Sequence, residues 1–157
     1  MQWIARDIYR RYPDRPDRRL WVGDCSPWGG NCPLHPDGSH DKSRAIDLNY
    51  YTWAPRNQTH YPMVASDLIW MWDRSNQDRI GYPETLLPIF DAERTGELWR
   101  LIMTCFPAAR ITTNDALWQA VRQVVGTPDW MWRIGRDVGQ VYWHHMHMHV
   151  DLGTDTC

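Results

Sequence analysis

Histidines are concentrated near the end of the chain, where residues 143–152 read WHHMHMHVDL and hold four of the seven histidines. If this segment is a β-strand, His145, His147, His149 and Asp151 share one face and apolar residues share the other. Imidazole is a common zinc ligand, and side chains on one face of a strand stand about 6 to 7 Å apart. One histidine can therefore bind a metal while its neighbour acts on a water. The alternative is that these histidines are simply polar residues on a solvent-exposed strand face. The regular alternation favours the metal site.

A second candidate pair of ligands precedes this strand by about a hundred residues, in the segment SHDKSRAID at 39–47. His40 falls in an expected loop, and Asp47 falls on the outward face of an expected half-buried strand over 45–51. Catalytic zinc sites use three protein ligands and keep one position for water. Two imidazoles and one carboxylate leave the ion positively charged, which lowers the pKa of that water to about 7. We therefore expect one catalytic zinc ion, bound by His40, Asp47 and a histidine of the terminal strand.

The elements that must position these ligands are predicted from periodicity and from helix caps. Leu98, Leu101, Ile102 and Cys105 at helical spacing indicate a helix over 92–105, which Pro107 ends. Asn114 or Asp115 caps a second helix that ends at Gly126. The remaining expected elements are a helix over 2–11, strands over 20–22, 45–51, 109–113 and 142–152, and an irregular loop over 23–39. Together they predict an α+β fold over residues 1–157, as a single domain. A small, mainly antiparallel sheet carries the zinc site, flanked by helices and long loops.

Composition describes an ordinary globular domain: 157 residues, 43% hydrophobic and 23% charged. These values exclude a disordered tail, a collagen-like repeat and a coiled coil. The net charge of -2 argues against a nucleic-acid partner, although every basic residue except Lys42 is an arginine. The arginines between Arg6 and Arg19 suit either an arm for an anionic polymer or a solvated helix face. Asp14 and Asp17 interrupt this run and favour the second interpretation.

The first twenty residues lack the apolar core of a secretory signal, and no stretch approaches the ~18 apolar residues of a membrane span. We therefore expect a chain that does not insert into a membrane. The cysteines form no CxxC pair and match no standard zinc module. Cys25 and Cys32 flank a glycine-rich loop. The sequence is compatible both with a disulfide between them and with two reduced, buried thiols. The full set is Cys25, Cys32, Cys105 and Cys157.

Five short segments follow one another in the order GDCS at 23–26, GG at 29–30, SH at 39–40, IDL at 46–48 and HMHV at 147–150. In type and order they resemble the penicillin-insensitive murein endopeptidases. That family belongs to the superfamily of lysostaphin-type, D-Ala-D-Ala and hedgehog-like zinc proteins. The resemblance runs from about Val22 to Leu152, and its most specific motifs lie at the two ends of that range.

The resemblance assigns a role to each matching position. It implies that His40, Asp47 and His149 bind zinc, that His147 lies beside the water, and that His144 is a second catalytic histidine. A regular strand would point His144 away from His147, so this last role requires the strand to begin or bulge after residue 144. The family hydrolyses peptide cross-links of bacterial peptidoglycan, typically between D-alanine and meso-diaminopimelate. The stem peptides of peptidoglycan are thus the expected partner. The resemblance assigns no residue to substrate binding.

The chain departs from the family pattern at several positions near the ligands. Asp37 stands where the family often has a histidine, with His35 nearby, and Ser43 and Ala45 replace a common glycine and aspartate. Asp151 replaces an arginine, which reverses a charge beside the expected cleft. The ligand positions are intact, so these departures bear on bond specificity rather than on metal binding.

Two other functions compete with the endopeptidase. D,D-carboxypeptidases and L-alanyl-D-glutamate endopeptidases of the same superfamily usually have a glutamate where this chain has Met146, which favours the murein endopeptidase. A non-catalytic zinc module or a histidine-rich sequestering protein is the alternative from another class. Sequestration needs neither Asp47 on a strand nor the distant His40. Without a signal, the chain suits a phage-type lytic enzyme that stays cytoplasmic until lysis, or a periplasmic enzyme whose signal was removed.

Overall fold

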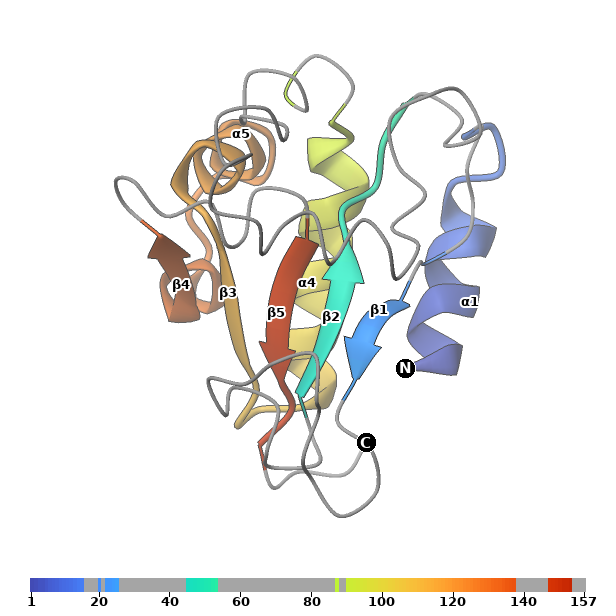
Figure 1. Ribbon diagram of the computed structural model, residues 1–157. Helices are drawn as coiled ribbons and strands as arrows, with labels where there is room; N and C mark the ends of the chain where they lie inside the picture. Colours follow the sequence, from blue (N-terminus) through green and yellow to red (C-terminus); the bar gives the residue numbers. More distant parts are fainter. Residues whose placement is uncertain are drawn as a thin grey trace, which may run out of the picture.

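The computed structural model describes residues 1–15, 20, 22–25, 45–53, 87, 90–137 and 147–153, without the side chains of 23–25. Several predictions lie outside these residues. They concern His40, His144 and His145, the irregular loop beyond Cys25, and the start of the terminal strand at 142–146. What the structure describes is a mixed α+β chain with one five-stranded sheet (Figure 1).

The helices form where the sequence predicts them. Helix α1 spans Gln2–Arg11, and helix α4 spans Ala92–Cys105, where the Asp91 side chain accepts a hydrogen bond of 3.0 Å from the Arg94 N–H. Helix α5 spans Asp115–Val125 and is capped by Asn114. It ends at Gly126, whose φ of 77° is costly for a residue with a side chain. No helix in the described ranges is long and apolar enough to cross a membrane.

The sheet has the strand order β1-β2-β5-β3-β4. Only β3 and β4 are parallel, so the expectation of a mainly antiparallel sheet is confirmed for the described strands. The strands are β1 (Val22–Cys25), β2 (Ala45–Asn49), β3 (Arg110–Asn114), β4 (Ile134–Asp137) and β5 (His147–Asp151).

Several predicted boundaries are wrong. β1 begins where the predicted strand over 20–22 ends, and it takes the first residues assigned to the irregular loop. β2 ends at Asn49 rather than residue 51, and β3 lies one residue later than predicted. The 3₁₀-helix Asp129–Arg133 and strand β4 were not predicted at all. β4 is four residues long and contains a glycine, so it lacks both the length and the alternation that signal a strand.

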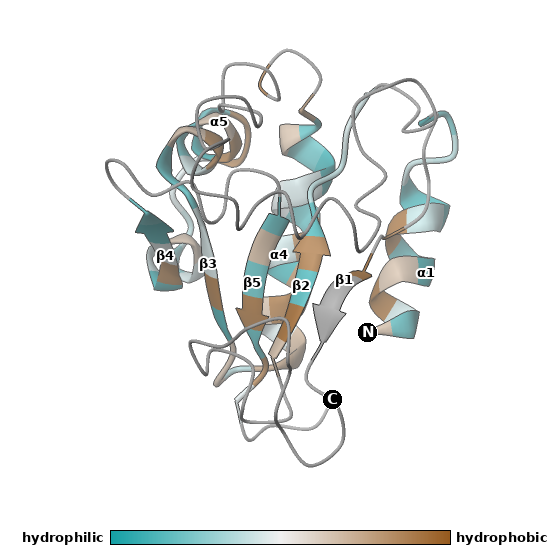
Figure 2. Ribbon diagram, in the orientation of Figure 1, coloured by the Kyte–Doolittle hydropathy of each residue, from teal (hydrophilic) through white to brown (hydrophobic). Residues whose placement is uncertain are grey.

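The apolar face of the sheet packs against α4, which lies behind β5 and β2, while α1 and α5 contact α4 from either side (Figure 1). Trp99 of α4 is fully buried and donates a hydrogen bond from Nε1 to the sulfur of Met148, at 3.1 Å. Leu48 and Val150 are also fully buried in this core. Figure 2 shows the resulting alternation of hydrophobic and hydrophilic residues along β2 and β5. The polar residues of β5 therefore lie on the face away from α4.

Tyr50 ties the end of β2 to β3 across the intervening β5. Its hydroxyl lies 2.6 Å from Oγ1 of Thr113, and its side chain is 1% exposed. Burial raises the pKa of Tyr50 far above its ordinary value, and the hydrogen bonds to Thr113 and the Asn114 backbone offset this only in part. Tyr50 therefore stays neutral and bonded at any pH the protein meets.

Tyr50→Phe is expected to lower the free energy of unfolding by about 1 to 2 kcal/mol, because it leaves the buried Thr113 hydroxyl without this partner. Urea denaturation followed by tryptophan fluorescence measures this as a lower midpoint with an unchanged slope. An unchanged midpoint would show that the hydroxyl contact contributes nothing to the attachment of β2 to β3.

Cys105, the last residue of α4, is disulfide-bonded. The alternatives left open for Cys25 and Cys32 concern side chains outside the described residues.

Candidate metal centre

The antiparallel pairing of β2 with β5 brings two of the predicted ligands together. Asp47 is the register partner of His149, and Asn49 is the register partner of His147. Leu48 and Met148, which alternate with these residues, pack into the core beside α4. Partners directly opposite each other in an antiparallel pair point to the same face, so all four polar side chains share the face away from α4.

Each carboxylate oxygen of Asp47 faces one imidazole. Oδ1 of Asp47 lies 3.2 Å from Nδ1 of His149, and Oδ2 lies 3.6 Å from Nε2 of His147. Residues 102 positions apart in the chain thus meet at a single carboxylate. The prediction that His147 and His149 share one strand face is confirmed.

Burial at this cluster differs from the prediction. Asp47 was expected on the outward side of a half-buried strand, but it is 1% exposed, and β2 is covered on both faces. The His147 side chain is 6% exposed and the His149 side chain 18% exposed. A buried carboxylate is costly unless a cation or strong hydrogen-bond donors compensate its charge. The site therefore favours a positive charge beside Asp47, supplied by a metal ion or by a protonated imidazole.

The donor atoms suit a metal ion of the zinc type. Two ligands at about 2.0 to 2.1 Å from a tetrahedral ion stand about 3.3 Å apart, close to the 3.2 Å between His149 and Asp47. A hydrogen bond accounts for the same distance. A further acceptor lies on this face, because the buried Oδ1 of Asn49 has no hydrogen-bond partner among the described residues. The cluster is therefore rich in acceptors, as expected of a cation site.

The described residues contain two of the three predicted ligands. Within them, no three His, Cys, Asp or Glu side chains form a group that could hold a metal ion. His40, the third predicted ligand, and His144, the second predicted catalytic residue, lie outside them. Asp47 and His149 place a carboxylate oxygen and an imidazole nitrogen 3.2 Å apart, and their role as zinc ligands stays a prediction.

Two residues beside the cluster were not singled out from the sequence. Asn49 lies two residues beyond Asp47 on β2, so the same alternation that indicated Asp47 also indicates Asn49. Thr112 of β3 is the register partner of His149 on its other side. No local pattern indicates Thr112, because its position depends on the pairing of β3 with β5.

The chain matches no protein-family model, no curated protein and no solved structure at a significant level. The family resemblance therefore depends on the motif residues themselves.

Proposed function

We propose that this chain is a zinc-dependent peptidase that hydrolyses peptide cross-links of bacterial peptidoglycan. One observation carries the proposal: Asp47 and His149 lie 3.2 Å apart at a buried position, with His147 at the other carboxylate oxygen. The same three positions match zinc ligands and a catalytic histidine in the murein endopeptidases that the sequence resembles. Zinc hydrolases combine such a ligand set with a nearby general base.

His40, Asp47 and His149 would hold the ion. A zinc ion bound there would act as a Lewis acid, which would polarise the scissile carbonyl and lower the pKa of a water molecule. The chain itself must then move the proton. His147 accepts the water proton at Nε2, the ring nitrogen nearer Asp47, and delivers it to the leaving amine as the peptide bond breaks.

The surroundings of His147 fix the position of its imidazole for proton transfer. Its side chain is 6% exposed, it lies on a strand paired on both sides, and its register partner is Asn49. A fixed imidazole needs no reorientation before proton transfer, which is the advantage of a preorganised base. His144 would assist the proton transfer or stabilise the oxyanion, as the family resemblance implies.

The compartment of action follows from the substrate, because peptidoglycan lies outside the cytoplasm. The disulfide at Cys105 supports the same location, since disulfides persist in oxidising compartments. Both a phage-type enzyme released by lysis and a periplasmic enzyme fit this proposal.

A turbidity assay on purified cell walls tests the proposed function. We expect the protein to clear the walls, to lose this activity in a chelator, and to regain it when zinc is restored. The matched control is His147→Ala, which should bind zinc without clearing the walls. Wild-type protein that binds zinc but never clears the walls would contradict the hydrolase and support a non-catalytic zinc module.

A further inference from the structure

A cavity of about 440 Å³ opens along β3 and β4, one strand away from the metal-ligand cluster. Thr112 lines this cavity and is also the register partner of His149, so the cavity begins beside the candidate metal centre. It continues toward the turn that precedes β3. The lining residues are Pro107, Ala108, Ala109, Arg110, Ile111, Thr112, Arg133 and Gly135.

The cavity is open because β4 has a glycine where it passes β3. A Cβ added at Gly135 would lie 3.4 Å from Oγ1 of Thr112 and 3.5 Å from the carbonyl oxygen of Ile111. Any larger side chain would extend from there into the space that the cavity now provides. Ala108 and Ala109, in the turn that precedes β3, also line the cavity. The result is a groove lined in part by small side chains, suited to an extended peptide.

Two arginines give the groove a positive charge. One guanidinium nitrogen of Arg133 donates to the carbonyl oxygens of Pro107 and Ala109, which holds the side chain against the groove wall. Arg110 is exposed, and its side chain forms no hydrogen bond or ion pair with any described residue. Arg110 can therefore bind a ligand without first breaking a contact within the described part of the chain.

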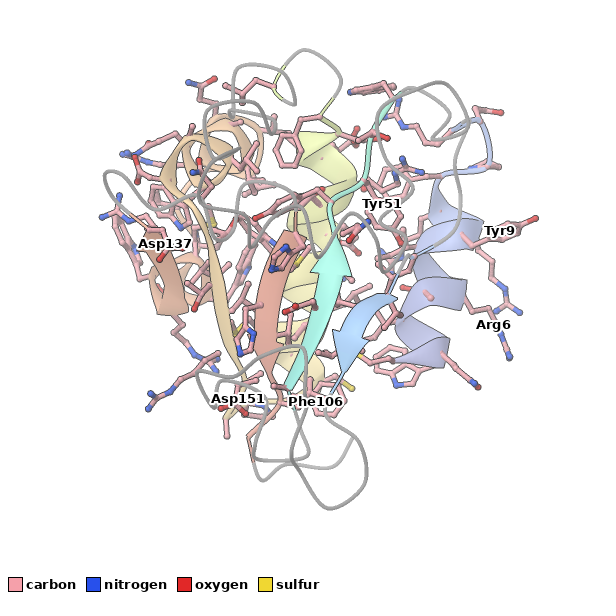
Figure 3. All side chains as sticks on the ribbon, viewed as in Figure 1. Arg6, Tyr9, Tyr51, Phe106, Asp137 and Asp151 are labelled. Carbon is pink, nitrogen blue, oxygen red and sulfur yellow. The ribbon has the colours of Figure 1, made fainter. Side chains whose placement is uncertain are left out.

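The acidic residue opposite Arg110 in the sheet forms no ion pair with it. Asp151 is its register partner on β5, at the lower end of that strand in Figure 3. Oδ1 of Asp151 instead accepts a hydrogen bond of 2.9 Å from the N–H of Gly153, and no ion pair joins the two register partners.

We propose that this groove binds a carboxylate of the peptide substrate, with Arg110 as the residue that selects it and Arg133 as a second cation. The inference rests on the proposed function, since peptidoglycan stem peptides carry free carboxylates on D-glutamate and meso-diaminopimelate. A guanidinium binds a carboxylate through two parallel hydrogen bonds, which gives both affinity and orientation. Arg110 is a specificity-determining residue here and takes no part in the bond cleavage.

Calorimetric titration with two synthetic stem peptides tests this inference. One peptide is L-Ala-γ-D-Glu-meso-diaminopimelate-D-Ala, and the other has the free carboxylates of its D-glutamate and diaminopimelate residues converted to amides. We expect wild-type protein to prefer the first peptide by about tenfold, the order expected from one charge-assisted hydrogen-bond pair. Arg110→Gln should lose this preference, with little change in affinity for the amidated peptide.

The matched control is Arg6→Gln, which makes the same charge change on α1, at the far side of the sheet from β3 and β4 (Figure 3). It should behave as wild type with both peptides. An Arg110→Gln protein that keeps the wild-type preference would overturn the inference, as would a wild-type protein with no preference.

Cleavage of cross-linked muropeptides, measured in parallel, separates the groove from the proposed function. If the wild type cleaves them and Arg110→Gln keeps the preference in binding, the groove assignment is wrong and the peptidase stands. If the wild type cleaves nothing, yet the preference depends on Arg110, the peptidase is wrong and the groove stands.

Discussion

Replacement of His147 by alanine is expected to lower kcat about 10³-fold while zinc remains bound at one ion per chain. The effect is large because general acid–base catalysis by one positioned group contributes about 10²- to 10⁴-fold. His147 faces Oδ2 of Asp47 at 3.6 Å, whereas His149 lies closer, at 3.2 Å from Oδ1. Zinc content by atomic emission and kcat on cross-linked muropeptides check the two halves of this expectation.

His149→Ala is the matched comparison, because it removes the neighbouring imidazole from the same face of β5. It should lose both zinc and turnover. Equal loss of zinc in the two variants would contradict the division of roles between ligand and base. Equal retention of zinc would remove His149 from the ligand set.

Replacement of Asp47 by asparagine is expected to abolish turnover and to weaken zinc binding by more than 100-fold. Loss of an outer-shell partner already costs about 10- to 100-fold in metal affinity, and a direct anionic ligand should cost more. Asparagine has nearly the same shape, so it tests the charge rather than the packing at a position that is 1% exposed. Competition with a chromophoric chelator measures the affinity.

Asp151→Asn provides the control for the loss of one carboxylate on the same face of the sheet. Asp151 lies on β5 beyond the ligand cluster, and its Oδ1 accepts from Gly153. This variant should bind zinc as the wild type does. If Asp47→Asn also kept wild-type affinity, the carboxylate would serve only to pair with the imidazoles, and the proposed metal site would be wrong.

Local patterns predicted the elements around the site well where the pattern was long. The spacing of Leu98, Leu101 and Ile102, together with the stop at Pro107, predicted a helix over 92–105, and helix α4 has the bounds Ala92–Cys105. The alternation in HMHVD correctly divides β5 into a polar and an apolar face. Each of these features is decided by residues within a few positions of one another.

Features that depend on the pairing of strands far apart in the sequence could not be predicted from local patterns. Asp47 was placed on an outward face, but its burial depends on what covers β2, which alternation does not reveal. The contact between Asp47 and His149 requires a register set by non-local pairing. β4 was missed because its four residues give no strand signal, and with it the groove beside Thr112 and Arg110.

Mass spectrometry of cross-linked muropeptides, digested with and without a chelator, tests the central claim most directly. A zinc-dependent peptidase predicts that cross-linked dimers become two monomers which together gain the elements of one water, with the glycan bonds intact. The chelator and the His147→Ala variant should both prevent this change. Unchanged dimers, cleavage of glycan bonds, or cleavage that persists in the chelator would contradict the assignment of Asp47, His147 and His149 to a hydrolytic metal centre.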